Sequence, residues 1–78
     1  MEYKGSVYTC MNIETILNKL PKTIQVDEYF GWLTINKIES GWQCGYLADD
    51  GYYIRGYNFI ADTLKEAVNR LDVRMAIL

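Results

Sequence analysis

Residues 42–51, WQCGYLADDG, combine a strand pattern with a turn pattern, and this combination decides the fold. Trp42, Cys44 and Tyr46 alternate with smaller or more polar residues, so they share one face of a strand. We expect that face to point into the core. The Asp-Gly pair at 50–51 then predicts a type I′ hairpin turn, with positive φ at both central positions.

One further strand is predicted on each side of this stretch. Residues 29–38 are rich in aromatic and β-branched side chains, and the Glu-Ser-Gly run at 39–41 supplies a turn. Residues 52–59 form the third strand, in which Gly56 marks a bulge or a close approach of backbone. Residues 23–26 are left open as a short fourth strand.

Helical patterns flank these strands. Residues 13–20 carry apolar side chains at helical spacing, with Asn12 as a competent N-cap and Pro21 as a stop. Further along, Thr63 and Glu66 form a capping box, in which the Thr63 hydroxyl accepts from the Glu66 amide and the Glu66 carboxylate accepts from the Thr63 amide. The helix that follows has one apolar stripe, made by Leu64, Ala67, Val68, Leu71 and Met75.

The predicted fold is therefore α+β, as a single domain over residues 1–78. It has a short N-terminal helix, a three-stranded antiparallel meander and a C-terminal amphipathic helix packed on one sheet face. Residues 1–10 show no clear period and are interpreted as a leader, an edge strand or a flexible tail.

Composition argues against catalysis, metal and cofactor. The chain has no histidine, the commonest acid-base group at neutral pH, and its two cysteines lie far apart, so no cofactor or metal is expected. Cys44 is mid-strand without an activating base, which favours a buried small hydrophobe. The acidic pairs at 27–28 and 49–50 point to different sides and are interpreted as solvated turn charges.

Two sequence features bear on the cellular compartment of the protein. Residues 1–10 lack a basic start followed by an apolar run, and no apolar stretch approaches the roughly 20 residues that span a bilayer. We therefore expect a cytoplasmic protein of a bacterium or a phage-infected host, with no membrane contact. A single disulfide between Cys10 and Cys44 stays open.

Charge is uneven along the chain, although the formal net charge is only −2. Residues 27–50 hold five acidic side chains against Lys37 alone. This acidity repels phosphate backbones, so nucleic acid is disfavoured, whereas a protein with a basic surface is attracted. A homodimer is an open alternative, because a core this small is often completed by a second copy.

Aromatic density points to binding, because nine of the eleven aromatic residues lie between 29 and 59 and one sheet cannot hide them all. Tyrosine, tryptophan and arginine are enriched at interface hot spots. The predicted partner-binding residues are Trp32, Tyr53, Arg55, Tyr57, Asp49 and Asp50. The alternative is that the tyrosines only finish a small core, with their hydroxyls in water.

The segment from Phe30-Gly31-Trp32 to Asp72 resembles a recurrent βββα pattern. It is similar to small phage and mobile-element accessory proteins, and its Asp62, Thr63, Glu66 and Ala67 match the D-T-x-x-E-A helix in the N-terminal part of HicB-like antitoxins. The chain departs from the HicB-like pattern, since it lacks the proline- and glycine-rich stretch before that helix and a DNA-binding segment.

These observations predict a non-catalytic protein-interaction domain. The phage resemblance implies an inhibitor of the anti-CRISPR or anti-defence type that blocks a protein partner through an aromatic and acidic sheet surface. The HicB-like resemblance implies instead an antitoxin that neutralises a small basic toxin. A small-ligand binder or enzyme is the third alternative, and it needs a pocket that a sheet and helix this small rarely enclose.

Overall fold

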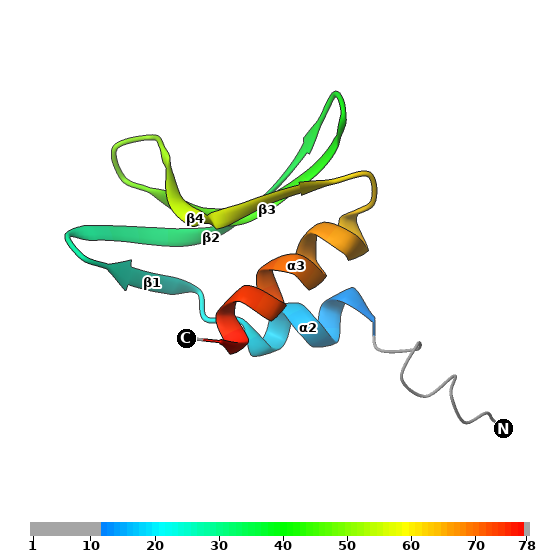
Figure 1. Cartoon of the computed structure of the whole chain (residues 1–78), viewed down its shortest axis with the longest axis horizontal. Coiled ribbons are helices and arrows are strands. Elements are labelled where there is room, and N and C mark those ends of the chain that lie inside the picture. Colours follow the sequence, from blue (N-terminus) through cyan, green and yellow to red (C-terminus); the bar gives the residue numbers. More distant parts are fainter. Residues whose placement is uncertain (1–11, 78) are drawn as a thin grey trace, which may run out of the picture.

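The computed structural model describes residues 12–77, which form an α+β domain with two helices and one antiparallel sheet. Both helices lie on the same side of the sheet (Figure 1). The strands follow the order β1-β2-β3-β4, so the meander and its fourth strand are confirmed. The expectations for residues 1–10, and for a disulfide to Cys10, lie outside the described residues. The elements are α2 (Ile13–Lys19), β1 (Thr23–Val26), β2 (Tyr29–Ile38), β3 (Gly41–Ala48), β4 (Tyr53–Ala61) and α3 (Leu64–Ala76).

Side-chain caps start both helices, as predicted. The Thr15 amide donates to Asn12 Oδ1 at 2.8 Å, and the Glu66 amide donates to Thr63 Oγ1 at 3.1 Å. The prediction for the second half of the capping box was wrong. The Glu66 carboxylate was expected to accept from the Thr63 amide, and it accepts from Arg70 Nη2 at 2.7 Å instead. Arg70 lies one helical turn further on and offers a charge-assisted bond.

The β3–β4 loop corrects the predicted turn type. The Gly51 amide donates to the Ala48 carbonyl at 3.0 Å, and the Ala48 amide donates to the Tyr52 carbonyl at 2.8 Å. Of the two central positions predicted to have positive φ, Asp50 does not have it, whereas Gly51 has a φ of 92°. A turn followed by a glycine in this conformation is the usual longer alternative to a two-residue hairpin.

A bulge interrupts β4 at Gly56, where φ is 88°. Gly45 pairs with Asn58, but Leu47, two residues further along β3, pairs with Tyr53. The extra residues of β4 reverse which side chains face the helices, because strand side chains alternate. As a result Ile54 and Tyr57 are both buried, although they are three positions apart and would face opposite sides of a regular strand.

The core lies between the helices and the face of the sheet that carries Cys44 and Tyr46. Both residues have no exposed surface, and Trp42 packs against the core cluster to which they belong, so the predicted core face of this strand is confirmed. The Tyr46 hydroxyl donates to the Pro21 carbonyl at 2.8 Å, which ties the sheet to the end of α2. The predicted α3 stripe is also confirmed; its members Ala67, Val68 and Leu71 are buried, while Leu64 and Met75 pack against the core.

Candidate functional site

The face of the sheet opposite the helices is the first candidate, and we call it the open face. The antiparallel register places an uncharged set of paired residues on it. These residues are Thr23, Gln25, Phe30, Trp32, Thr34, Asn36, Ile38, Gly41, Gln43, Gly45, Leu47, Tyr53, Asn58 and Ile60. A solvated sheet face in a chain with 23% charged residues is expected to carry charge, so this composition is unusual.

Two aromatic rings dominate the open face. Phe30 and Trp32 are two residues apart on β2, and their ring centroids lie 5.0 Å apart in an edge-to-face arrangement at 87°. They are 40% and 47% exposed. Register sets Trp32 beside Leu47, and Leu47 beside Tyr53, so an apolar and aromatic row crosses three strands. Exposed aromatic side chains that gather at one place are typical of interaction surfaces.

Side-chain hydrogen bonds order the polar part of the open face. Asn36 Nδ2 donates to the Tyr53 hydroxyl at 2.8 Å, and Gln43 Nε2 donates to Asn58 Oδ1 at 2.9 Å. Since β3 lies between β2 and β4, the bond from Asn36 to Tyr53 passes over β3. The tip of the β2–β3 hairpin and the β3–β4 loop both rise away from the helices on this side (Figure 1), which gives the face a curved outline.

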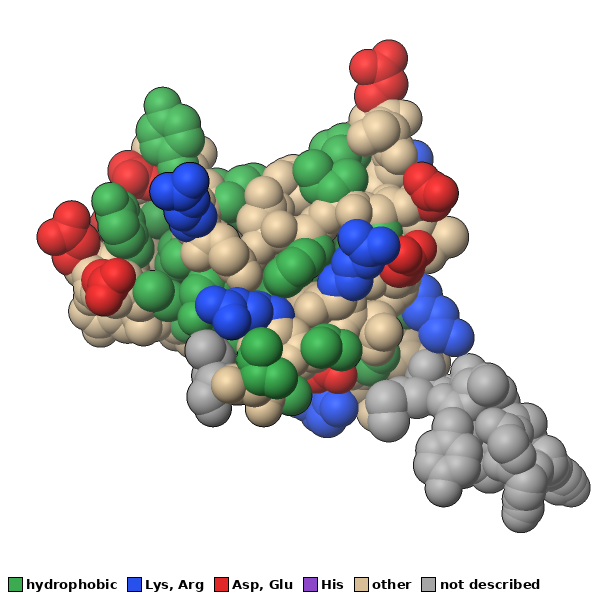
Figure 2. All heavy atoms as spheres, in the orientation of Figure 1, with side chains coloured by type: hydrophobic (Ala, Val, Ile, Leu, Met, Phe, Trp, Pro, Cys, Tyr) green, Lys and Arg blue, Asp and Glu red, His purple; other side chains and the backbone are tan. Residues whose placement is uncertain are grey.

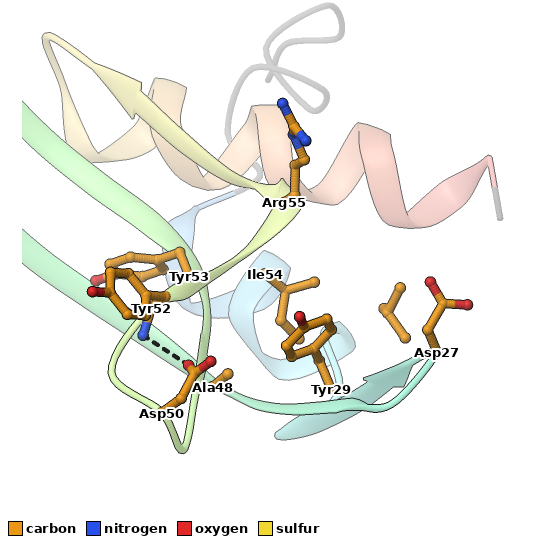
Figure 3. A pocket seen from close by; sticks show the side chains of 9 residues that line it. Asp27, Tyr29, Ala48, Asp50, Tyr52, Tyr53, Ile54 and Arg55 are labelled. Carbon is orange, nitrogen blue, oxygen red and sulfur yellow. Dashed lines mark hydrogen bonds between the residues drawn. The ribbon is translucent and has the colours of Figure 1, made fainter.

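A pocket of about 560 Å³ is the second candidate. It lies between the β1–β2 turn and the β3–β4 loop, so segments far apart in the sequence form it (Figure 3). Its lining is Val26, Asp27, Tyr29, Ala48, Asp50, Tyr52, Tyr53, Ile54 and Arg55. The volume is within the range of sites that take small molecules or single side chains.

Acidic side chains gather at the hairpin ends (Figure 2). Asp27 and Glu28 form the β1–β2 turn, Glu39 is in the β2–β3 turn, and Asp49 and Asp50 are in the β3–β4 loop. The acidity predicted for the sheet region therefore borders the open face and does not lie on it.

The predicted partner-binding residues are not one surface. Trp32 and Tyr53 are on the open face, where the rings can meet a partner. Asp49 and Asp50 are exposed in the loop, and Arg55 is exposed in the bulge. The pocket lining brings Asp50, Tyr53 and Arg55 together, whereas Asp49 lies outside it.

Tyr57 was wrong as an exposed anchor. It is 6% exposed, and Arg74 of α3 lies over its ring, with the guanidinium carbon 4.8 Å from the ring centroid. Arg74 Nε also donates to the Gly56 carbonyl at 3.2 Å. The bulge turns the Tyr57 side chain to the helix side of the sheet. For this residue the alternative interpretation holds, in which the tyrosine completes the core.

Phe30 is the functional candidate that the sequence selection missed. A signal was present, because Phe30 and Trp32 are two residues apart and hence share a strand face. Asn36 and Gln43 had no such signal, because their bonds depend on the pairing of strands that are distant in the sequence.

Burial sets the chemistry of the two most enclosed titratable groups. It raises the pKa of the Cys44 thiol to about 11, which keeps the thiolate, the reactive form, rare at neutral pH. Burial first, and the neighbouring Cys44 second, raise the pKa of Tyr46 to about 12. Both side chains are therefore part of the packed core.

Residues 12–77 contain no group of three or more cysteine, aspartate or glutamate side chains placed to hold a metal ion. In the same part of the chain, no helix has the length and apolar character needed to cross a bilayer. The sequence matches no protein-family model, and no similar protein was found among curated proteins or solved structures.

Proposed function

We propose that this chain is a non-catalytic protein-interaction domain whose open face binds a protein partner. The observation that carries the proposal is the Phe30–Trp32 pair, two large rings in contact with each other and roughly half exposed on a face whose strand-paired residues carry no charge. Aromatic anchors surrounded by groups that can hydrogen-bond are the usual centre of a protein interface.

The surroundings of the open face indicate the kind of partner. Carboxylates border it at the hairpin ends, so a partner with basic groups around an apolar centre is attracted and oriented. An inhibitor of the phage type and an antitoxin are both members of this class. The identity of the bound protein decides between them.

The test uses two matched double variants of the full chain. Phe30→Ala with Trp32→Ala removes the anchors, whereas Val73→Ala with Ile77→Ala removes exposed apolar side chains, 56% and 70% exposed, at α3 on the other side of the sheet. Each tagged protein is incubated with host lysate. The captured protein is then purified and titrated calorimetrically against each variant.

The expected result is one stoichiometric partner that binds the wild type and the Val73/Ile77 variant equally. The Phe30/Trp32 variant is expected to bind at least a hundredfold more weakly, since two anchors of this kind contribute about 1.5–2 kcal/mol each or more. Equal binding by both variants contradicts the proposal. So does a wild type that sediments as a dimer while the Phe30/Trp32 variant is a monomer, because the rings then pair with a second copy.

A further inference from the structure

The pocket beside the β1–β2 turn differs from the open face, although Tyr53 belongs to both. Tyr29 and Gly31 alternate with Phe30 and Trp32 on β2, so the pocket is on the helix side of the sheet. Both sites lie at the end of the sheet that holds the β1–β2 turn and the β3–β4 loop. A partner seated on the open face can therefore reach the pocket around this end.

The floor of the pocket is apolar. Val26, Tyr29, Ala48 and Ile54 line it, and Figure 3 shows the Tyr29 ring and the Ile54 side chain close together at its centre. Tyr29 is 46% exposed, so one side of its ring is open to a guest. A floor of this kind suits a chain of methylene groups or a flat group that stacks on a ring.

The charges around that floor are mostly negative. Asp27 and Asp50 belong to the lining, and neither carboxylate is in an ion pair with any of the described residues. Asp27 has a φ of 55°, a conformation that aspartate tolerates better than most residues. Arg55 is the lining cation, but its side chain points away from Tyr29 and Ile54 (Figure 3).

We propose that this pocket takes an arginine side chain of the protein partner. This inference rests on the proposed function, because it names the group by which that partner is recognised. The methylene stem lies on Val26 and Ile54. The planar guanidinium stacks on the open ring of Tyr29 and is bound by the carboxylate of Asp27 or Asp50. Arginine fits better than lysine, since its flat fork both stacks on rings and binds carboxylates in two places.

The probe is N-acetyl-L-arginine amide, titrated into the ¹⁵N-labelled full chain. N-acetyl-L-citrulline amide is the matched control, because it has nearly the same shape without the charge. The expected result is saturable amide shifts confined to residues 26–29 and 48–55, with a Kd on the order of millimolar for a single side chain. Citrulline amide is expected to bind at least fivefold more weakly.

Variants then test whether the carboxylates of the lining bind the guanidinium. Asp27→Asn with Asp50→Asn is expected to reduce arginine affinity to that of citrulline. In the native chain the Tyr52 amide donates to Asp50 Oδ1 at 3.0 Å, and asparagine at position 50 keeps an oxygen that can accept this bond. Asp49→Asn, a loop acid outside the lining, is the matched control and is expected to change little. Equal binding of arginine and citrulline, or equal loss in both variants, overturns the proposal.

The Phe30→Ala, Trp32→Ala variant separates this inference from the proposed function. Its pocket is intact, so it is expected to bind arginine amide like the wild type while failing to capture the partner. Arginine binding without any partner contradicts the interaction-domain proposal alone. Partner capture through the rings without arginine binding contradicts the pocket proposal alone.

Discussion

The two faces of the sheet are built from the same four strands but differ in what their side chains contact. On the helix side, Cys44 and Tyr46 have no exposed surface, and the described buried residues are all apolar or aromatic. On the open face, Phe30 and Trp32 touch each other and water. The difference teaches that aromatic content alone does not reveal a residue's role: the rings of one face are buried in the core, and those of the other are open to solvent.

The largest expected contrast is between core and open-face truncation. Leu71→Ala is expected to reduce the free energy of unfolding by about 3 kcal/mol, because it leaves a cavity in a fully buried site. Trp32→Ala is expected to reduce it by about 1 kcal/mol or less, since the ring is nearly half exposed. Urea unfolding followed by far-ultraviolet circular dichroism measures both; equal losses would contradict the distinction between the faces.

Glycine substitutions test how closely β3 and β4 approach. A Cβ on Gly45 would lie 2.5 Å from the Tyr57 carbonyl oxygen, so Gly45→Ala forces the backbone apart and is expected to cost about 2–3 kcal/mol. Gly51→Ala meets no atom within 4 Å, but its φ of 92° is strained for alanine, which costs about 1 kcal/mol. Thermal unfolding ranks the pair, and a milder effect at Gly45 would count against so close an approach of the two strands.

Alkaline pH is expected to destabilise the fold through Cys44, which lies on the helix side of the sheet. Well below pH 9 the thiol is protonated in both the folded and the unfolded state, so it contributes no pH dependence there. Above pH 9 the unfolded chain loses this proton first, because the folded pKa is about 11, and stability is expected to fall by about 2–3 kcal/mol by pH 11. Tyr46 continues the fall from pH 10 towards 12.

Cys44→Ala provides the control for this pH effect. Without the thiol, the alkaline loss of stability is expected to start near pH 10, where unfolded tyrosine begins to ionise. The measurement is the urea midpoint at half-unit steps from pH 8 to 11. Identical profiles for wild type and variant would show that Cys44 is not buried as described.

The smallest expected contrast compares two tyrosine hydroxyls. Tyr46→Phe removes the bond to the Pro21 carbonyl from the core and is expected to cost about 1 kcal/mol. Tyr53→Phe removes the exposed bond from Asn36 and is expected to cost less than about 0.5 kcal/mol. Urea unfolding of both variants is the check, and a larger loss for Tyr53 would make the open face part of the stabilising structure.

Local patterns predicted the elements well, for reasons visible in single residues. Asn12 and Thr63 begin the helices because their side chains accept from amides three residues on, and this depends only on neighbouring sequence. Cys44 and Tyr46 followed from alternation along one strand. These interactions are short in sequence, so the sequence alone was sufficient to predict them.

The errors arose where pairing between distant segments decides the outcome. Gly56 indicated a bulge, but the number of extra residues depends on the β3–β4 register, and that number put Tyr57 in the core. The pocket joins Asp27 to Ile54 across 27 positions of the chain, which no local pattern indicates. Consequently the fold was largely predicted, whereas the candidate sites were predicted only in part. The predicted residues include Trp32 and Tyr53 on the open face. They also include Asp50, Tyr53 and Arg55 in the pocket lining.

The central claim is that the Phe30–Trp32 pair serves binding more than folding. The most direct measurement determines two quantities on the Phe30→Ala, Trp32→Ala variant: its free energy of unfolding in urea and its affinity for the captured partner. We predict a loss of stability of about 1–2 kcal/mol, with the fold retained, and at least a hundredfold loss of affinity. A variant that unfolds, or that binds like the wild type, contradicts the account.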